Sequence, residues 1–139
     1  MATYEMKLDS DLKEVYRVET LVKAIAAEHH FTPVFLYDVM LLITEATNNA
    51  VMHGNKFDRN KHAWLLCEVR GDDFYIEVRD EGAGFNLNDV PDPLAEENLL
   101  KPSGRGVFLM RQIAKHVDYT FSPEGTTVKI LIPIKRETP

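Results

Sequence analysis

The sequence has 139 residues, of which 45% are apolar and 27% are charged, so we expect one compact domain over residues 1–139. Its 16 basic and 22 acidic side chains give a net charge of -6, which argues against binding to nucleic acid, because such domains usually carry a basic face. The lone Cys67 excludes an internal disulfide, and no apolar run approaches the ~18 residues of a membrane span. We therefore expect a cytoplasmic protein that binds neither nucleic acid nor a membrane.

Residues 3–8 alternate weakly between polar and apolar side chains, which predicts a first β-strand. Ser10 is a candidate N-cap for the element that follows, since its hydroxyl can accept a hydrogen bond from a backbone N–H of the first helical turn. Apolar residues then recur at three- and four-residue spacing as far as His29, which predicts an amphipathic helix.

A second helix should begin at Thr32-Pro33, a capping hydroxyl followed by proline at the first helical position. We expect it to run to about His53, with Gly54-Asn55 as the stop. Three polar interruptions break its apolar side: Thr44-Glu45, Asn48-Asn49 and Met52-His53. Polar groups at a core-facing position cost free energy unless a partner satisfies them, so this helix is a candidate for a functional role.

The second half of the chain is predicted to be mainly β. Strands are expected at 63–69 and 74–79, joined by a hairpin turn at 71–73, and a second hairpin is expected from 118–121 and 126–134. Alternation of apolar and polar residues along these runs indicates a sheet with one buried and one solvated face.

Between these hairpins the periodicity fails from Phe85 to Ser103, which is typical of a functional lid or a disordered loop. A short helix is expected from near Gly104 to His116 or Val117, and residues 135–139 are expected to form a frayed tail. The element order predicts a two-layer α/β (α+β) sandwich, in which helices cover one face of a mixed, mostly antiparallel sheet.

Glu45 and Asn49 lie four residues apart on the second predicted helix, so their side chains project from the same face. A carboxylate can accept a proton or orient a hydroxyl nucleophile, and an amide oxygen suits Mg²⁺ beside phosphate oxygens. The spacing alone favours a simpler interpretation, an exposed polar stripe.

Asp80, Gly82 and Gly84 follow a predicted strand. An aspartate there can accept a hydrogen bond from the exocyclic amine of adenine, and the glycines let the backbone approach the base. By itself this run fits an acidic turn better.

Residues 103–107 (SGRGV) stand at a predicted helix start, where backbone N–H groups and the helix dipole can hold a phosphate. The run lacks the Gly-Lys-Ser/Thr ending of a Walker A loop and is not a dinucleotide fingerprint. Arg105 either reaches a phosphate or stays in solvent. Further along, Gly125-Thr126-Thr127 leads into a strand.

Residues 45–55 (EATNNAVMHGN), the Asp80 run, the 103–107 run and Gly125-Thr126 resemble, in this order, the nucleotide pocket of the gyrase/Hsp90/histidine-kinase/MutL ATP-binding superfamily. The motifs are most similar to those of the bacterial anti-sigma-factor serine/threonine kinases of the RsbW and SpoIIAB type. This resemblance implies the superfamily's ATP-binding fold, ATP or ADP and Mg²⁺ as cofactors, and Glu45 as the group that activates a Ser or Thr hydroxyl. It implies a metal ligand at Asn49 and the following nucleotide-binding set: Asn49, Asp80, Gly82, Gly84, Gly104, Arg105, Gly106, Val107 and Thr126.

The resemblance also implies what the protein acts on. Kinases of this type phosphorylate a small antagonist protein of the anti-anti-sigma type, sequester a sigma factor or similar regulator, and form homodimers. Arg17 lies where related kinases carry an arginine that engages partner and nucleotide.

Two other functions stay open. One is a nucleotide-gated protein-binding module without phosphotransfer, against which Glu45 argues, because a pure binder has little need of a base. The other is the catalytic half of a sensor histidine kinase, which the Asn-Ala-x-x-His-Gly run at 49–54 fits less well.

Overall fold

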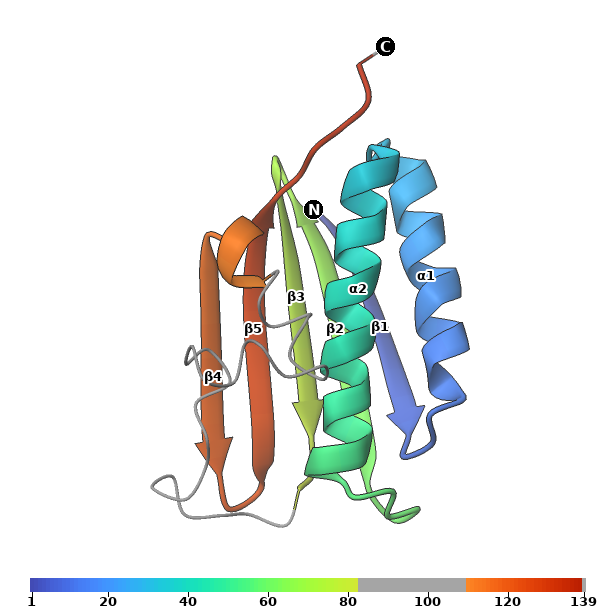
Figure 1. Ribbon diagram of the computed structural model, residues 1–139, viewed down its shortest axis with the longest axis vertical. Helices are drawn as coiled ribbons and strands as arrows, with labels where there is room; N and C mark the ends of the chain where they lie inside the picture. The colour runs from blue at the N-terminus through green and yellow to red at the C-terminus, as the bar shows by residue number, and fades with distance from the viewer. Residues whose placement is uncertain (83–109, 139) are drawn as a thin grey trace.

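The computed structural model describes residues 1–82 and 110–138. They form a five-stranded sheet with two long helices on one of its faces (Figure 1). The strand order is β1-β2-β3-β5-β4, and every pairing between the described strands is antiparallel. The predicted two-layer sandwich is confirmed, and its described sheet is antiparallel throughout rather than mixed.

The first strand and helix, β1 (Ala2–Asp9) and α1 (Glu14–His29), are confirmed, but the predicted cap is wrong. No side chain caps α1. The chain makes a separate turn after β1, which leaves Ser10 too early to reach the first turn of the helix. The Ser10 hydroxyl instead donates to the carbonyl oxygen of Lys61 at 2.6 Å.

The second helix, α2 (Pro33–Asn49), begins as predicted. Thr32 Oγ1 accepts a hydrogen bond from the backbone N–H of Phe35 at 3.2 Å. The helix then widens into one π-helical turn, η1 (Ala50–Gly54), and the chain leaves it at Asn55. Helix and turn together end at the predicted glycine stop.

The four remaining strands are β2 (His62–Arg70), β3 (Asp73–Asp80), β4 (His116–Ser122) and β5 (Gly125–Pro133), in the two predicted hairpins. The short helix does not extend as far as predicted, because residues 110–113 are helical and β4 already begins at residue 116. Its expected start near Gly104, and the lid at 85–103, lie outside the described residues.

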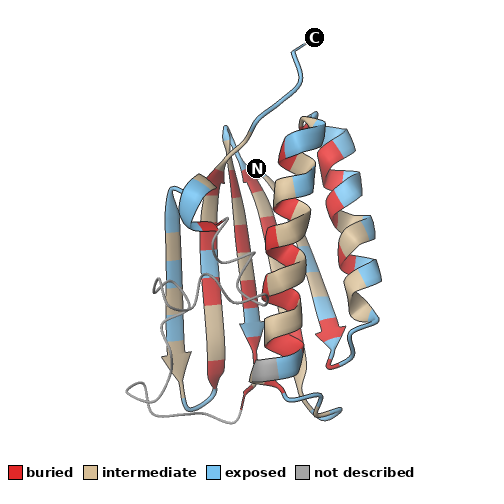
Figure 2. Ribbon diagram, in the orientation of Figure 1, coloured by how far each residue is buried: buried red, intermediate tan, exposed pale blue. Residues whose placement is uncertain are grey.

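The core lies between the helices and the sheet (Figure 2). Strand residues alternate, so every second side chain of β2 and β3 is buried against the helices. Burial raises the pKa of the Cys67 thiol to about 12, as expected for a structural cysteine. On the opposite face, guanidinium groups cover two aromatic rings: Arg79 over Trp64 and Arg70 over Tyr75.

The C-terminal tail is not frayed as far as Glu137, contrary to the prediction. The backbone N–H of Thr32 donates to the carbonyl of Lys135 at 2.9 Å, and that of Glu137 donates to the carbonyl of His30 at 2.8 Å. Arg136 pairs with the turn between β2 and β3. The tail therefore ties the loop between α1 and α2 to the sheet.

Removing residues 135–139 should lower the free energy of unfolding by about 1–3 kcal/mol, because each of the two lost backbone hydrogen bonds contributes about 0.5–1.5 kcal/mol. Urea unfolding followed by circular dichroism measures this. Arg136→Ala keeps the backbone bonds and should cost less. An unchanged urea midpoint for the truncated chain would show that the tail contributes nothing.

Candidate functional site

The candidate site is built around Asp80, the last residue of β3, which is only 7% exposed. Its Oδ1 accepts hydrogen bonds from the backbone N–H groups of Gly82 at 2.9 Å and Thr126 at 3.1 Å. Burial raises the pKa of this carboxyl, while the two N–H groups and the charge of Lys61 act in the opposite direction. The structure thus brings together three residues that the sequence predicted for one site.

Three glycines allow the segments around Asp80 to pack closely against it. A Cβ on Gly54 would lie 2.2 Å from Asp80 Oδ2, and one on Gly82 would lie 2.8 Å from the carbonyl oxygen of Gly54. A Cβ on Gly125, whose φ is +147°, would lie 2.0 Å from the Asp80 carbonyl oxygen. Gly54 is therefore more than the predicted helix stop, because the end of η1 can meet Asp80 only without a side chain.

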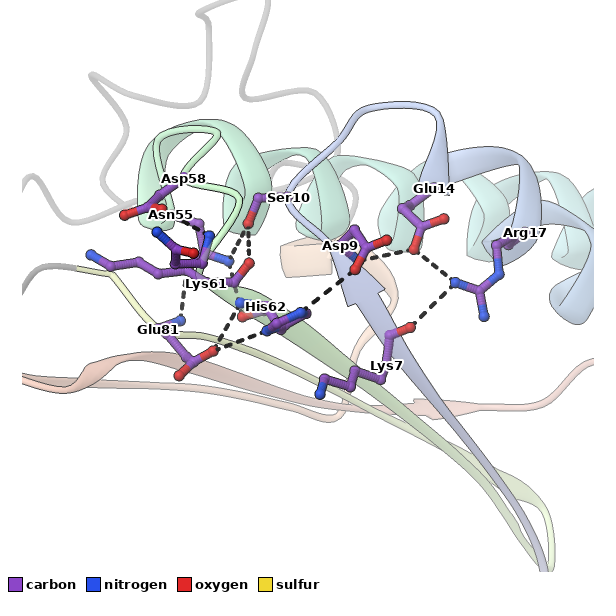
Figure 3. A network of polar contacts seen from close by, with 11 residues as sticks. Lys7, Asp9, Ser10, Glu14, Arg17, Asn55, Asp58, Lys61, His62 and Glu81 are labelled. Carbon is purple, nitrogen blue, oxygen red and sulfur yellow. Dashed lines mark hydrogen bonds and ion pairs between the residues drawn. The ribbon is translucent and has the colours of Figure 1, made fainter.

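A buried polar network beside Asp80 escaped the sequence analysis (Figure 3). Asn55 is 1% exposed, and its Oδ1 accepts from the backbone N–H of Glu81 at 2.8 Å. Its Nδ2 donates to the carbonyl of His62 at 2.9 Å and to Ser10 Oγ at 3.1 Å. Ser10 and Asn55 lie 45 residues apart, so no local pattern could have linked them.

Glu45 and Asn49 both lie on α2, one helical turn apart. Glu45 Oε1 is buried and has no hydrogen-bond partner among residues 1–82 and 110–138. Burial raises the pKa of Glu45, and the neighbouring Asn49 side chain lowers it in part. A carboxylate with a raised pKa is a better proton acceptor near neutral pH.

Helix α2 runs directly into η1, which packs against β2, β3 and β5. Glu45 and Asn49 are therefore on the helix whose end meets Asp80. A π-helical turn is rare and is often found at functional sites. Here the turn places Gly54 against the Asp80 carboxylate.

The remaining predicted residues are five that lie outside the described part of the chain, and Arg17. Those outside the described residues are Gly84, Gly104, Arg105, Gly106 and Val107. Arg17 is described, and its Nη1 donates to Glu14 Oε2 at 2.7 Å and to the Lys7 carbonyl at 3.3 Å, at the far end of the polar network in Figure 3.

A hollow of about 320 Å³ lies at the same end of the sheet. Its walls include Trp64, Arg79 and Thr127, which alternate with the buried residues of their strands and so belong to the face without helices. Asp80, Glu81 and Gly125 also line this hollow, so it borders the end of β3 from the face without helices, whereas the Asp80 carboxyl meets Gly54 on the helix side.

The residues present fit an adenine nucleotide. Within the described part of the chain the hydrogen bonds to the Asp80 carboxylate go to Oδ1, which leaves Oδ2 as an acceptor beside a space that a Cβ on Gly54 would fill. Such an acceptor suits an amine donor. Among the described residues no group of three His, Cys, Asp or Glu side chains could hold a metal ion, and no helix has the length and apolar character needed to cross a membrane.

Comparison with known proteins identifies the family. The family model described as a histidine kinase-like ATPase domain matches residues 8–132. The anti-sigma F factor of Shouchella clausii is 29% identical over 112 residues, which are 78% of this chain and 77% of that protein. The anti-sigma F factor of Clostridium perfringens strain 13 is 30% identical over 120 residues, 84% of each.

Solved structures share the fold. The RsbU and RsbW domains of Rv1364c from Mycobacterium tuberculosis superpose with a TM-score of 0.72 at 17% identity, covering 99% of this chain and 34% of that one. The histidine kinase domain of a blue-light activated kinase from Erythrobacter litoralis gives 0.63 at 20% identity, covering 88% and 60%. Because the family model matches most of this chain, the chain belongs to the histidine kinase-like ATPase family. Within that family it is similar to the anti-sigma F factors.

Proposed function

We propose that this protein is an ATP-dependent serine/threonine protein kinase that acts as an anti-sigma regulator. It phosphorylates a small antagonist protein of the anti-anti-sigma type and sequesters a sigma factor or a similar regulator. Membership of the histidine kinase-like ATPase family supports the binding of ATP, and the similarity to anti-sigma F factors supports the regulatory role.

Asp80 is the residue that would recognise the base. Its Oδ1 is held by Gly82 and Thr126, so Oδ2 is the oxygen left to accept a hydrogen bond from the exocyclic amine of adenine. Burial strengthens this interaction, because a hydrogen bond to an ionised group is worth more where water is excluded.

Glu45 carries the proposal of phosphotransfer. A buried carboxylate oxygen without a partner is costly, and native proteins keep such groups where they serve a function. When bound, ATP supplies the phosphoryl group. Glu45 would take the proton of the Ser or Thr hydroxyl while the hydroxyl oxygen forms the new bond to the γ-phosphorus. ADP would leave with the electrons of the broken P–O bond.

Asn49 would complete the site by holding Mg²⁺. It offers an amide oxygen one helical turn from Glu45, and Mg²⁺ commonly combines one or two protein oxygens with phosphate oxygens and water. One rigid helix would then supply both the base and the metal ligand.

Nucleotide would also govern the choice of partner. A regulator that binds an antagonist and a sigma factor needs a surface whose affinity for each depends on the nucleotide bound. Phosphorylated antagonist would dissociate and leave the protein free to hold the sigma factor. A homodimer, implied by the resemblance to stand-alone kinases of this type, belongs to the same proposal.

Asp80→Asn should weaken ADP binding about 10- to 100-fold, because it replaces a charge-assisted hydrogen bond with an amide whose NH₂ opposes the adenine amine. Titration calorimetry measures the affinity. The exposed Asp118→Asn on β4 is the matched control and should bind as the original chain does. Equal ADP affinity for both variants would refute the assignment of the base to Asp80.

Glu45→Gln should leave ADP affinity nearly unchanged and reduce phosphotransfer about 10²- to 10⁴-fold, the usual contribution of a positioned base. The assay combines γ-labelled Mg·ATP, lysate of the source organism and either protein, with the exposed Glu5→Gln as the control. Acid-stable label on a small protein, formed by the original chain and the control but not by Glu45→Gln, is the expected result.

The same assay separates the alternatives. Label formed by Glu45→Gln at the original rate would show that Glu45 is not the base. Acid-labile label would indicate transfer to histidine. Absence of label from a protein that binds ATP would favour a nucleotide-gated binding module.

A further inference from the structure

The side chain of Asn55 uses all of its hydrogen-bonding groups inside the protein. Its carbonyl oxygen accepts from one backbone N–H, and its NH₂ group donates to one backbone carbonyl and one hydroxyl, all at 2.8–3.1 Å. The residue is 1% exposed. A buried amide satisfied in this way fixes the groups around it in one arrangement.

Asn55 fixes two backbone groups, one in the turn immediately after Asp80 and one at the start of β2. Asn55 Oδ1 holds the N–H of Glu81, and Asn55 Nδ2 holds the carbonyl of His62. Glu81 Oε1 in turn accepts from the N–H of His62 at 2.8 Å. These three bonds form a closed ring that joins the end of η1, the start of β2 and the end of β3 (Figure 3).

The neighbouring Gly54 makes this ring relevant to the Asp80 carboxylate. The α-carbon of Gly54 is so near Oδ2 that a Cβ would lie 2.2 Å away, and the Gly54 carbonyl would be 2.8 Å from a Cβ on Gly82. Because Gly54 and Asn55 share a peptide bond, a shift of Asn55 relative to Glu81 moves Gly54 against Oδ2. The direction of Oδ2 therefore depends on the ring.

We propose that Asn55 is a positioning residue of the nucleotide site: braced by Glu81, it fixes the direction of Asp80 Oδ2 and thereby sets the preference for adenine over guanine nucleotides. The inference rests on the proposed binding of ATP and ADP. Adenine presents an amine donor at the ring position where guanine presents a carbonyl acceptor. A carboxylate oxygen held in one direction favours the donor and repels the acceptor. A carboxylate oxygen that can turn discriminates less between the two.

A purely structural role for Asn55 predicts a different outcome. Lost stability reduces the folded fraction and so weakens binding of every nucleotide by the same factor. The ratio of ADP to GDP affinity is unaffected by that loss. It changes only if the geometry at Asp80 changes.

The test measures ADP and GDP affinities by calorimetry for the original chain, Asn55→Ala and Glu81→Ala. Asn55→Ala should weaken ADP binding about tenfold, the worth of one well-placed hydrogen bond, with little effect on GDP, so that the ratio of affinities falls by about the same factor. Glu81→Ala removes the second brace and should lower the ratio in the same direction. Because the Glu81 side chain is 43% exposed, this variant should fold even if Asn55→Ala does not.

The chain lacking residues 135–139 is the control for lost stability, because the tail follows the end of β5 that lies away from Asp80 (Figure 1). It should keep the original ratio. An unchanged ratio in Glu81→Ala and in any folded Asn55→Ala would overturn the positioning role. An original chain that binds neither nucleotide would instead overturn the proposed function itself.

Discussion

The structure at the candidate site depends on keeping one carboxylate, that of Asp80, out of water at the end of a central strand. Burial raises its pKa, which measures the cost of holding a charge there. Two backbone N–H groups, from Gly82 and Thr126, offset part of that cost, and glycines replace the side chains that would otherwise collide with it. The result is an acceptor that is fixed but not fully satisfied by the described residues, as recognition of an amine donor requires.

The sheet topology supplies these partners. Because β5 pairs with β3 on one side as well as with β4 on the other, the backbone of Thr126 reaches Asp80. η1 packs at the same end of the sheet, so that Gly54 lies against Asp80 Oδ2 and Asn55 bonds to the backbone of Glu81. Helix α2 packs its apolar side on the sheet, and its polar positions and the turn at its end belong to the candidate site.

Much of this arrangement could be predicted from local patterns. The strands and long helices follow hydrophobic periodicity, Thr32 caps α2 through a four-residue motif, and Glu45, Asp80 and Thr126 stand in motifs of fixed spacing. Errors arose where a residue has a distant partner. Ser10 has the chemistry of a helix cap but bonds to Lys61, and the C-terminal residues look unstructured until the loop between α1 and α2 offers them backbone partners.

The sequence by itself determined the fold class, the family and which residues are candidates for binding a nucleotide, because periodicity and motif spacing are local properties of the chain. Only the tertiary structure decided why Gly54 must be glycine and what Asn55 does. Gly54 touches a carboxylate 26 positions away, Asp80, and Asn55 joins Ser10, His62 and Glu81. Contacts between segments so far apart depend on how the layers pack, and a buried amide has the same local sequence signature as an exposed one.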